Sequence, residues 1–141
     1  MQLVTFERML IERLNATGQV KAQSYHEAGA SLLYGVLLRA GSGNVAVRLT
    51  KGSGTGDPKP TEQEQAEHDA YVARAAAGKQ APRSQSDADL DRKVSNLMRD
   101  VLAADLPPTA VGVEGRADGR ERPGVKIRFD TGAEIYMTPV A

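Results

Sequence analysis

The chain has 141 residues, of which 40% are hydrophobic and 26% charged, a composition typical of a soluble globular protein. Lysine plus arginine equals aspartate plus glutamate at 18 each, so no net charge attracts the protein to nucleic acid or to an acidic membrane. There are no cysteines, which excludes disulfides, thiolate zinc sites and a cysteine nucleophile.

No stretch of the chain has the pattern of a membrane or secretion segment. The longest apolar run, residues 32–38, is interrupted by Tyr34 and Gly35 and falls far short of the roughly 20 residues that cross a bilayer. The first residues also lack the basic start and apolar block of a secretory signal. We therefore expect a cytoplasmic protein without a membrane partner.

The N-terminal part predicts one helix followed by three strands. Alternating patterns predict the strands over residues 20–25, 31–39 and 45–50, with a glycine turn at 41–44 between the last two. Before them, Thr17-Gly18 marks the end of an amphipathic helix. The apolar stripe of this helix consists of Phe6, Met9, Leu10 and Leu14.

Residues 25–40 also fit a helix. Ser24 and Glu27 have the spacing of a capping box, and Gly41 stands where a C-cap glycine would. The sequence alone leaves strand and helix open here, and the internal repeat described below favours the strand.

A glycine-rich stretch and a polar helix come next. Lys51–Pro60 has three glycines two positions apart, but it lacks the Gly-Lys-Ser/Thr of a phosphate-binding loop and the spacing of a dinucleotide fingerprint. Glycine with proline instead predicts a mobile spacer. Thr61 and Glu64 then form a capping box for a thinly apolar helix over residues 61–77. We therefore predict that residues 52–86 form a flexible linker containing an exposed helix.

A third helix and a set of strands complete the chain. Ser86 and Asp89 are expected to cap this helix, and Pro107-Pro108 ends it. A broad stripe along it must face a core, and consists of Leu90, Val94, Leu97, Met98, Val101 and Leu102.

The C-terminal residues predict a short strand at Val111–Glu114, a charged loop at residues 115–124 and a hairpin with its turn at Asp130–Ala133. Hydrophobic residues alternate along both strands of the hairpin. They are Val125, Ile127 and Phe129 on the first strand, and Ile135 and Met137 on the second.

The two ends of the chain resemble each other at a nearly constant offset. The stripes of the first and third helices match 88 positions apart, and V-L-L-R at 36–39 matches V-K-I-R at 125–128. This internal repeat predicts an α+β fold of two helix-plus-antiparallel-meander units, residues 1–51 and 87–141. The units must share one core, because neither buries enough surface alone, so residues 1–141 form a single domain. The core can be shared within one chain or between the protomers of a homodimer.

No motif for catalysis, metal binding or cofactor binding is complete. The histidines, His26 and His68, lie beside Glu27 and Asp69 but lack the H-x-H or H-x-x-x-H spacing of metal ligands. No G-x-S-x-G nucleophile elbow occurs. We therefore predict no catalytic residue, no metal site and no cofactor, and we expect that the protein is not an enzyme.

One basic segment suggests an alternative function. Five cations in and beyond the loop at residues 115–124 could contact phosphates, although Glu114, Asp118, Glu121 and Asp130 cancel much of their field. These candidate nucleic-acid-binding residues are Arg116, Arg120, Arg122, Lys126 and Arg128.

The preferred prediction is a non-enzymatic binding protein, an adaptor, chaperone-like or regulatory module that acts on another macromolecule, with another protein as its partner. The order helix, three strands, helix is similar to that of secretion chaperones, which are dimers that hold unfolded partner segments. That similarity covers the order of elements alone. We also expect a homodimer, and the alternative functions are nucleic-acid binding and small-ligand binding.

Overall fold

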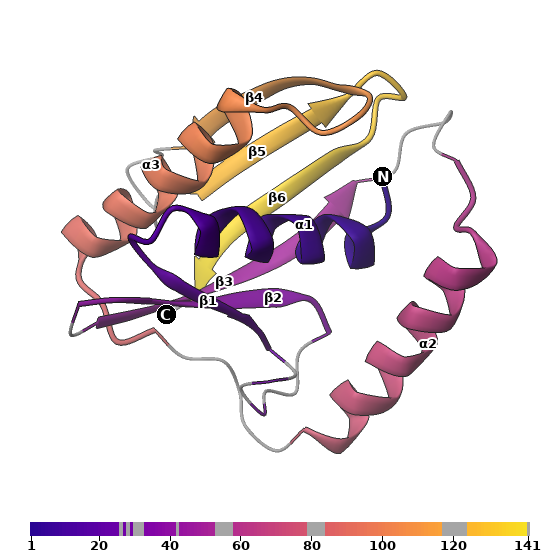
Figure 1. Cartoon of the computed structure of the whole chain (residues 1–141), viewed down its shortest axis with the longest axis horizontal. Coiled ribbons are helices and arrows are strands. Elements are labelled where there is room, and N and C mark those ends of the chain that lie inside the picture. Colours follow the sequence, from indigo (N-terminus) through magenta and orange to yellow (C-terminus); the bar gives the residue numbers. More distant parts are fainter. Residues whose placement is uncertain are drawn as a thin grey trace.

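The computed structural model consists of three helices and one six-stranded antiparallel sheet (Figure 1), which confirms the predicted α+β class. The residues that the structure describes are 1–25, 27, 29, 33–41, 43–52, 58–78, 84–116 and 124–140. The elements are α1 (Leu3–Ala16), β1 (Lys21–Ser24), β2 (Gly35–Ala40), β3 (Gly43–Gly52), α2 (Glu62–Ala77), α3 (Ala88–Ala104), β4 (Ala110–Arg116), β5 (Gly124–Phe129) and β6 (Glu134–Val140).

The strands run in the order β1-β2-β3-β6-β5-β4, so each half of the chain contributes one meander. The halves join at the central pair β3–β6, which is in register from Ala46 opposite Val140 to Gly52 opposite Glu134. The order of elements repeats, as the sequence pattern predicts. Common origin of the two halves stays a prediction.

Helices α1 and α3 cover one face of the sheet (Figure 1), and the core lies between them and the strands. A single hydrophobic cluster contains side chains from both halves, which confirms the shared core. Burying each large apolar side chain contributes about 1.5–3 kcal/mol. The fully buried members include Phe6, Leu10, Leu14, Leu38, Met98, Leu102, Ile127, Ile135 and Met137.

The helical alternative for residues 25–40 is wrong. β2 pairs with β1 and β3, and the Tyr25 amide donates to the Gly35 carbonyl at 3.1 Å. Val36 and Leu38 point into the core while Arg39 is exposed, so the burial follows the period of two that a half-buried strand requires. His26 and residues 28 and 30–32 lie outside the described residues.

Two predicted boundaries need correction. The N-cap of α3 is Asp87, whose Oδ1 accepts the Leu90 amide at 2.8 Å, rather than Ser86 with Asp89. The Ser86 hydroxyl instead donates to the buried Asp91 carboxylate at 2.7 Å. The strand predicted to end at Glu114 continues to Arg116, because its pairing with β5 extends to Gly124.

Part of the predicted linker is attached to the sheet. The Gln85 backbone exchanges two hydrogen bonds of 2.9 Å with Asn44, and the Ser84 hydroxyl accepts the Ala46 amide at 3.0 Å. These contacts continue the sheet where β6 ends. Residues 53–57 and 79–83 lie outside the described part of the chain, and the mobility of the linker stays a prediction.

The structure confirms the exposed helix and its capping box. The Thr61 hydroxyl accepts the Glu64 amide and the Glu64 carboxylate accepts the Thr61 amide, both at 3.1 Å, and α2 has no buried residue. Because packing contributes little to this helix, Thr61→Ala should destabilise it by about 1 kcal/mol. Faster amide hydrogen exchange confined to α2 would confirm this, whereas unchanged exchange would contradict it.

None of the helices within the described residues has both the length and the apolar content needed to span a bilayer.

Candidate functional site

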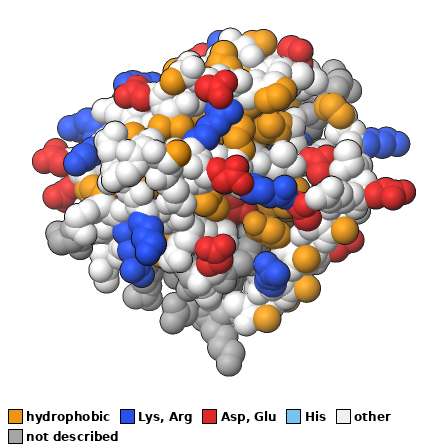
Figure 2. Space-filling view, in the orientation of Figure 1, with side chains coloured by type: hydrophobic (Ala, Val, Ile, Leu, Met, Phe, Trp, Pro, Cys, Tyr) orange, Lys and Arg blue, Asp and Glu red, His pale blue; other side chains and the backbone are white. Residues whose placement is uncertain are grey.

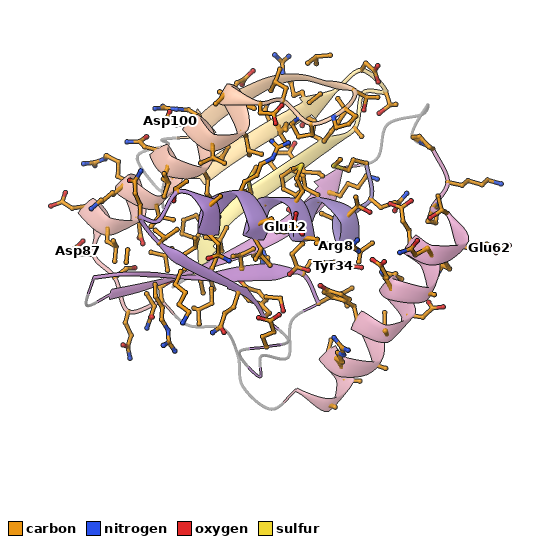
Figure 3. The ribbon with its side chains drawn as sticks, in the orientation of Figure 1. Arg8, Glu12, Tyr34, Glu62, Asp87 and Asp100 are labelled. Carbon is orange, nitrogen blue, oxygen red and sulfur yellow. The ribbon has the colours of Figure 1, made fainter. Side chains whose placement is uncertain are left out.

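The junction between α2 and the rest of the fold gathers the most unusual set of polar side chains. The helix lies beside the sheet rather than over it, and Arg8 and Tyr34 occupy the space between it and α1 (Figures 1 and 3). Residues three and four apart share one face of a helix. The inner face of α2 therefore consists of Glu64, Glu67, His68 and Tyr71.

Each of the first three residues of this face has a polar partner on the body of the fold. Thr5 Oγ1 donates to Glu64 Oε2 at 2.5 Å, and Arg8 forms an ion pair with Glu67. The Tyr34 hydroxyl and His68 Nδ1 are hydrogen-bonded at 2.7 Å. Hydrogen bonds and one ion pair hold the helix in place, together with the half-buried Tyr71, which packs against the hydrophobic core.

Tyr34 is the centre of a three-ring stack. Its centroid lies 5.1 Å from the ring of Tyr71 and 5.9 Å from that of His68, with interplanar angles of 26° and 22°. Stacked rings at this separation add a modest attraction beyond their buried area. With Tyr34 only 6% exposed, α2 acts as the cover of this ring.

Below the stack, α1 places an acid in the interior. Glu7 is fully buried; its Oε1 accepts the Gly35 amide at 3.2 Å, and Tyr71 hydrogen-bonds to the same carboxyl group. Oε2 has no hydrogen-bond partner within the described residues. Burial disfavours the charged form and raises the pKa of Glu7 to about 7, despite the opposing hydrogen bonds from Tyr71 and Gly35.

Tyr25 closes the far side of this acid. It is 1% exposed, its hydroxyl has no hydrogen-bond partner in the described part of the chain, and its ring lies over Gly35. Burial raises the pKa of Tyr25 and of Tyr71 above the usual value, and it raises the pKa of Tyr34 to about 12. All three phenols therefore keep their protons at neutral pH.

A cavity of about 240 Å³ adjoins the stack between the start of α1, the end of β3 and α2. The apolar part of its wall is Leu3, Val4, Pro60 and Tyr34, and the polar part is Gln2, Lys51, Glu64, Gln65 and His68. The cavity therefore lies along the contact between α2 and the body of the fold, and it is open to solvent.

A second hollow runs along α3. It is an open groove of about 610 Å³, with half-buried Leu97 and Val101 among charged residues that include Asp89 and Arg92. Acidic and basic side chains are interspersed over the face covered by α1 and α3 (Figure 2). No single-sign patch is visible there that would select an oppositely charged partner.

The structure brings two of the five candidate nucleic-acid-binding residues together. Lys126 and Arg128 lie on the sheet face opposite the helices, within 3.7 and 3.1 Å of the Glu114 carboxylate, and Lys126 also lies 4.0 Å from Glu134. These acids offset the field that would attract phosphates. Arg116 ends β4 with its side chain undescribed, and Arg120 and Arg122 lie outside the described residues.

The structure describes only one of the two histidines. His68 hydrogen-bonds to Tyr34 and His26 lies outside the described residues. Within the described ranges, no group of three histidine, cysteine, aspartate or glutamate side chains could hold a metal ion. That the protein has no metal, cofactor or catalytic site stays a prediction.

Sequence reasoning missed Glu7, although a signal for it exists. Leu3, Leu10 and Leu14 lie four before, three after and seven after Glu7, so the glutamate occupies the apolar face of α1. A charged residue in that stripe is either buried with its apolar neighbours or interrupts the buried face of the helix. The partners on α2 carry no comparable signal, because 59 positions separate Thr5 from Glu64 and Arg8 from Glu67.

Comparison of the chain with family models, with curated proteins and with solved structures gave no match.

Proposed function

We propose that the chain is a non-enzymatic binding protein, an adaptor, chaperone-like or regulatory module that acts on another protein. The observation that carries this proposal is that α2 contains no fully buried residue and is held mainly by polar side-chain contacts, with Tyr71 as its one core-packed ring among the described residues. Ion pairs near the surface typically contribute between 0 and about 1 kcal/mol. A partner that offers equivalent contacts can therefore take the place of this helix.

The surface beneath α2 would be the binding surface. We call it the docking strip and define it as Thr5, Glu7, Arg8 and Tyr34. The partner would present a helix, because the strip already accommodates one. Side chains on that helix would take the place of Tyr71 and His68 over the ring of Tyr34 and keep it buried.

The proposal includes two further properties. The protein would form a homodimer, and sedimentation equilibrium would show twice the mass of one chain. It would act in the cytoplasm, where a chain without cysteines loses nothing to reducing conditions.

Chemical bridging of α2 to α1 tests the binding surface. In the variant Thr5→Cys/Glu64→Cys, a short bismaleimide would join thiols whose native side chains are 2.5 Å apart at their polar atoms. Since the chain has no other cysteine, the bridge is specific. We expect affinity capture from the native host to retain a partner on the unbridged variant and at least tenfold less on the bridged one.

Two controls complete this test. The single variant Val72→Cys, at an exposed position of α2 outside the docking strip and capped with a monomaleimide, should retain the partner as well as the wild type does. Equal retention on bridged and unbridged protein would show that α2 does not cover the binding surface, and would overturn the proposal.

A further inference from the structure

The packing around Glu7 links the position of α2 to a single proton. Glu7 and the helix share a direct contact, because Tyr71 of α2 hydrogen-bonds to the Glu7 carboxyl group. The carboxylate is fully buried and has no cation among its hydrogen-bond partners in the described residues. An ionised carboxylate without a countercharge is costly in such surroundings.

The groups that face Glu7 add little positive charge. Those on the strand side are the Gly35 amide and the hydroxyl-bearing Tyr25 and Tyr34, with Glu27 after β1 raising the pKa of Glu7 further. On the α2 side, Tyr71 faces Glu7, while Glu67 and His68 contact the neighbouring Arg8 and Tyr34. Arg8 and Arg48 act on Tyr71 and Tyr25 respectively rather than on the carboxylate itself.

Lifting α2 would restore water to this carboxylate. Tyr71 and His68 would leave with the helix, so the upper side of the docking strip would open to solvent. Water stabilises the ionised acid and hardly affects the neutral one. Ionisation of Glu7 thus favours the lifted position, and protonation favours the docked one.

We propose that α2 is a proton-controlled cover: protonated Glu7 keeps the helix docked, and loss of that proton lets it lift from the docking strip. The inference rests on the proposed function, since it assigns a regulator to the proposed binding surface. A partner would find the surface more accessible at neutral and alkaline pH than in mildly acidic conditions.

The pKa of Glu7 in the docked and lifted states determines whether lifting increases with pH, and over which pH range. The docked state has a pKa of about 7 for Glu7, whereas a solvated glutamate has the ordinary value of 4.5. The ratio of lifted to docked protein should therefore rise with pH between those two values, by at most about tenfold per pH unit because Gly35, Tyr25 and Tyr34 stay beside the carboxyl group. It should level off above pH 7, at up to roughly 300 times its value in acid.

Energy transfer between two dyes measures this ratio directly. In the full chain, Glu12→Cys on α1 and Val72→Cys on α2 place both labels at exposed positions of an otherwise cysteine-free protein. Single-molecule measurements from pH 5 to pH 8 should show the low-transfer population growing and then reaching a plateau. The β-sheet signal in the far-UV circular dichroism spectrum should stay constant over the same pH range.

Variants identify the responsible group. Glu7→Gln should remain docked at every pH, and the exposed Glu62→Gln should behave as the wild type. Tyr71→Phe removes a hydrogen bond that lowers the pKa of Glu7, so it should shift the plateau to a higher pH. His68→Gln removes the α2 side chain that hydrogen-bonds to Tyr34, and it is measured in parallel and should keep the pH dependence.

The outcomes separate this inference from the proposed function. The inference is overturned if the ratio of lifted to docked protein does not vary with pH. It is also overturned if the pH dependence persists in Glu7→Gln or vanishes in His68→Gln. None of these outcomes affects the bridging result. Loss of bridging-sensitive capture, with a pH-dependent ratio retained, overturns the proposed function alone.

Discussion

Replacement of Gly35 by alanine is expected to destabilise the protein by about 3 kcal/mol. A Cβ atom at this position in β2 would lie 2.0 Å from Cε2 and 2.1 Å from Cζ of Tyr25. That ring is 1% exposed, so it cannot move aside without leaving its packed position. Urea unfolding followed by circular dichroism measures the loss.

A glycine on the neighbouring strand provides the matched control. A Cβ atom at Gly52 in β3 would meet no atom closer than 3.9 Å, so Gly52→Ala should change the free energy of unfolding by less than about 1 kcal/mol. The double variant Gly35→Ala/Tyr25→Ala should lose clearly less than the sum of the single losses, because it removes the clash. Equal effects of the two glycine substitutions would mean that Tyr25 does not pack on Gly35.

Glu7→Gln is expected to stabilise the protein by up to about 3 kcal/mol at pH 8 and hardly at all at pH 4.5. The pKa of Glu7 is about 7 in the folded protein, above its ordinary value of 4.5, so the folded state binds the proton more tightly. Wild-type stability from this group is therefore fully present below pH 4.5 and is lost as the pH rises through 7. Glutamine is neutral throughout and avoids that loss.

Urea unfolding of both proteins at several pH values tests this expectation. Glu12→Gln, an exposed position on the same helix, should give a curve parallel to that of the wild type. If the Glu7→Gln curve also runs parallel to the wild type, Glu7 has the same pKa in the folded and unfolded protein, and its burial does not disfavour the charged form.

Most of the elements follow from local patterns in the sequence. The apolar stripe of α3 and the alternation of Val125, Ile127 and Phe129 each place a face against the core, and the structure has both faces buried there. The capping box at Thr61 and Glu64 is equally predictable from the sequence, because its two residues lie three positions apart. Short sequence separation is what made these features predictable.

The remaining features depend on the tertiary structure. For residues 35–40, one amphipathic stretch satisfied both helical and strand signals, and pairing with β1 and β3 decided between them. The N-cap of α3 was misplaced because Ser86, Asp87 and Asp89 all have suitable side chains. Ser86 instead bonds to the buried Asp91, which the sequence pattern does not indicate.

The candidate site was the least predictable part. Its contacts join α1, β2 and α2, and the residues involved show no motif when read along the chain. The bond between Tyr34 and His68 spans 34 positions, and it exists only because α2 returns to the side of the sheet. Glu7 alone could have been noticed, as a charge within an apolar stripe.

The central position of the β3–β6 pair has a consequence for synthesis on the ribosome. β3 is complete at Gly52, but its partner strand begins only at Glu134. At typical translation rates, this delay lasts on the order of ten seconds. During that time β3 can pair with β2 but its other edge, which includes Val47 and Leu49, is open, and an open apolar edge is prone to aggregate with other nascent chains. Rapid overproduction should therefore favour inclusion bodies, and slower translation at low temperature should favour the native protein.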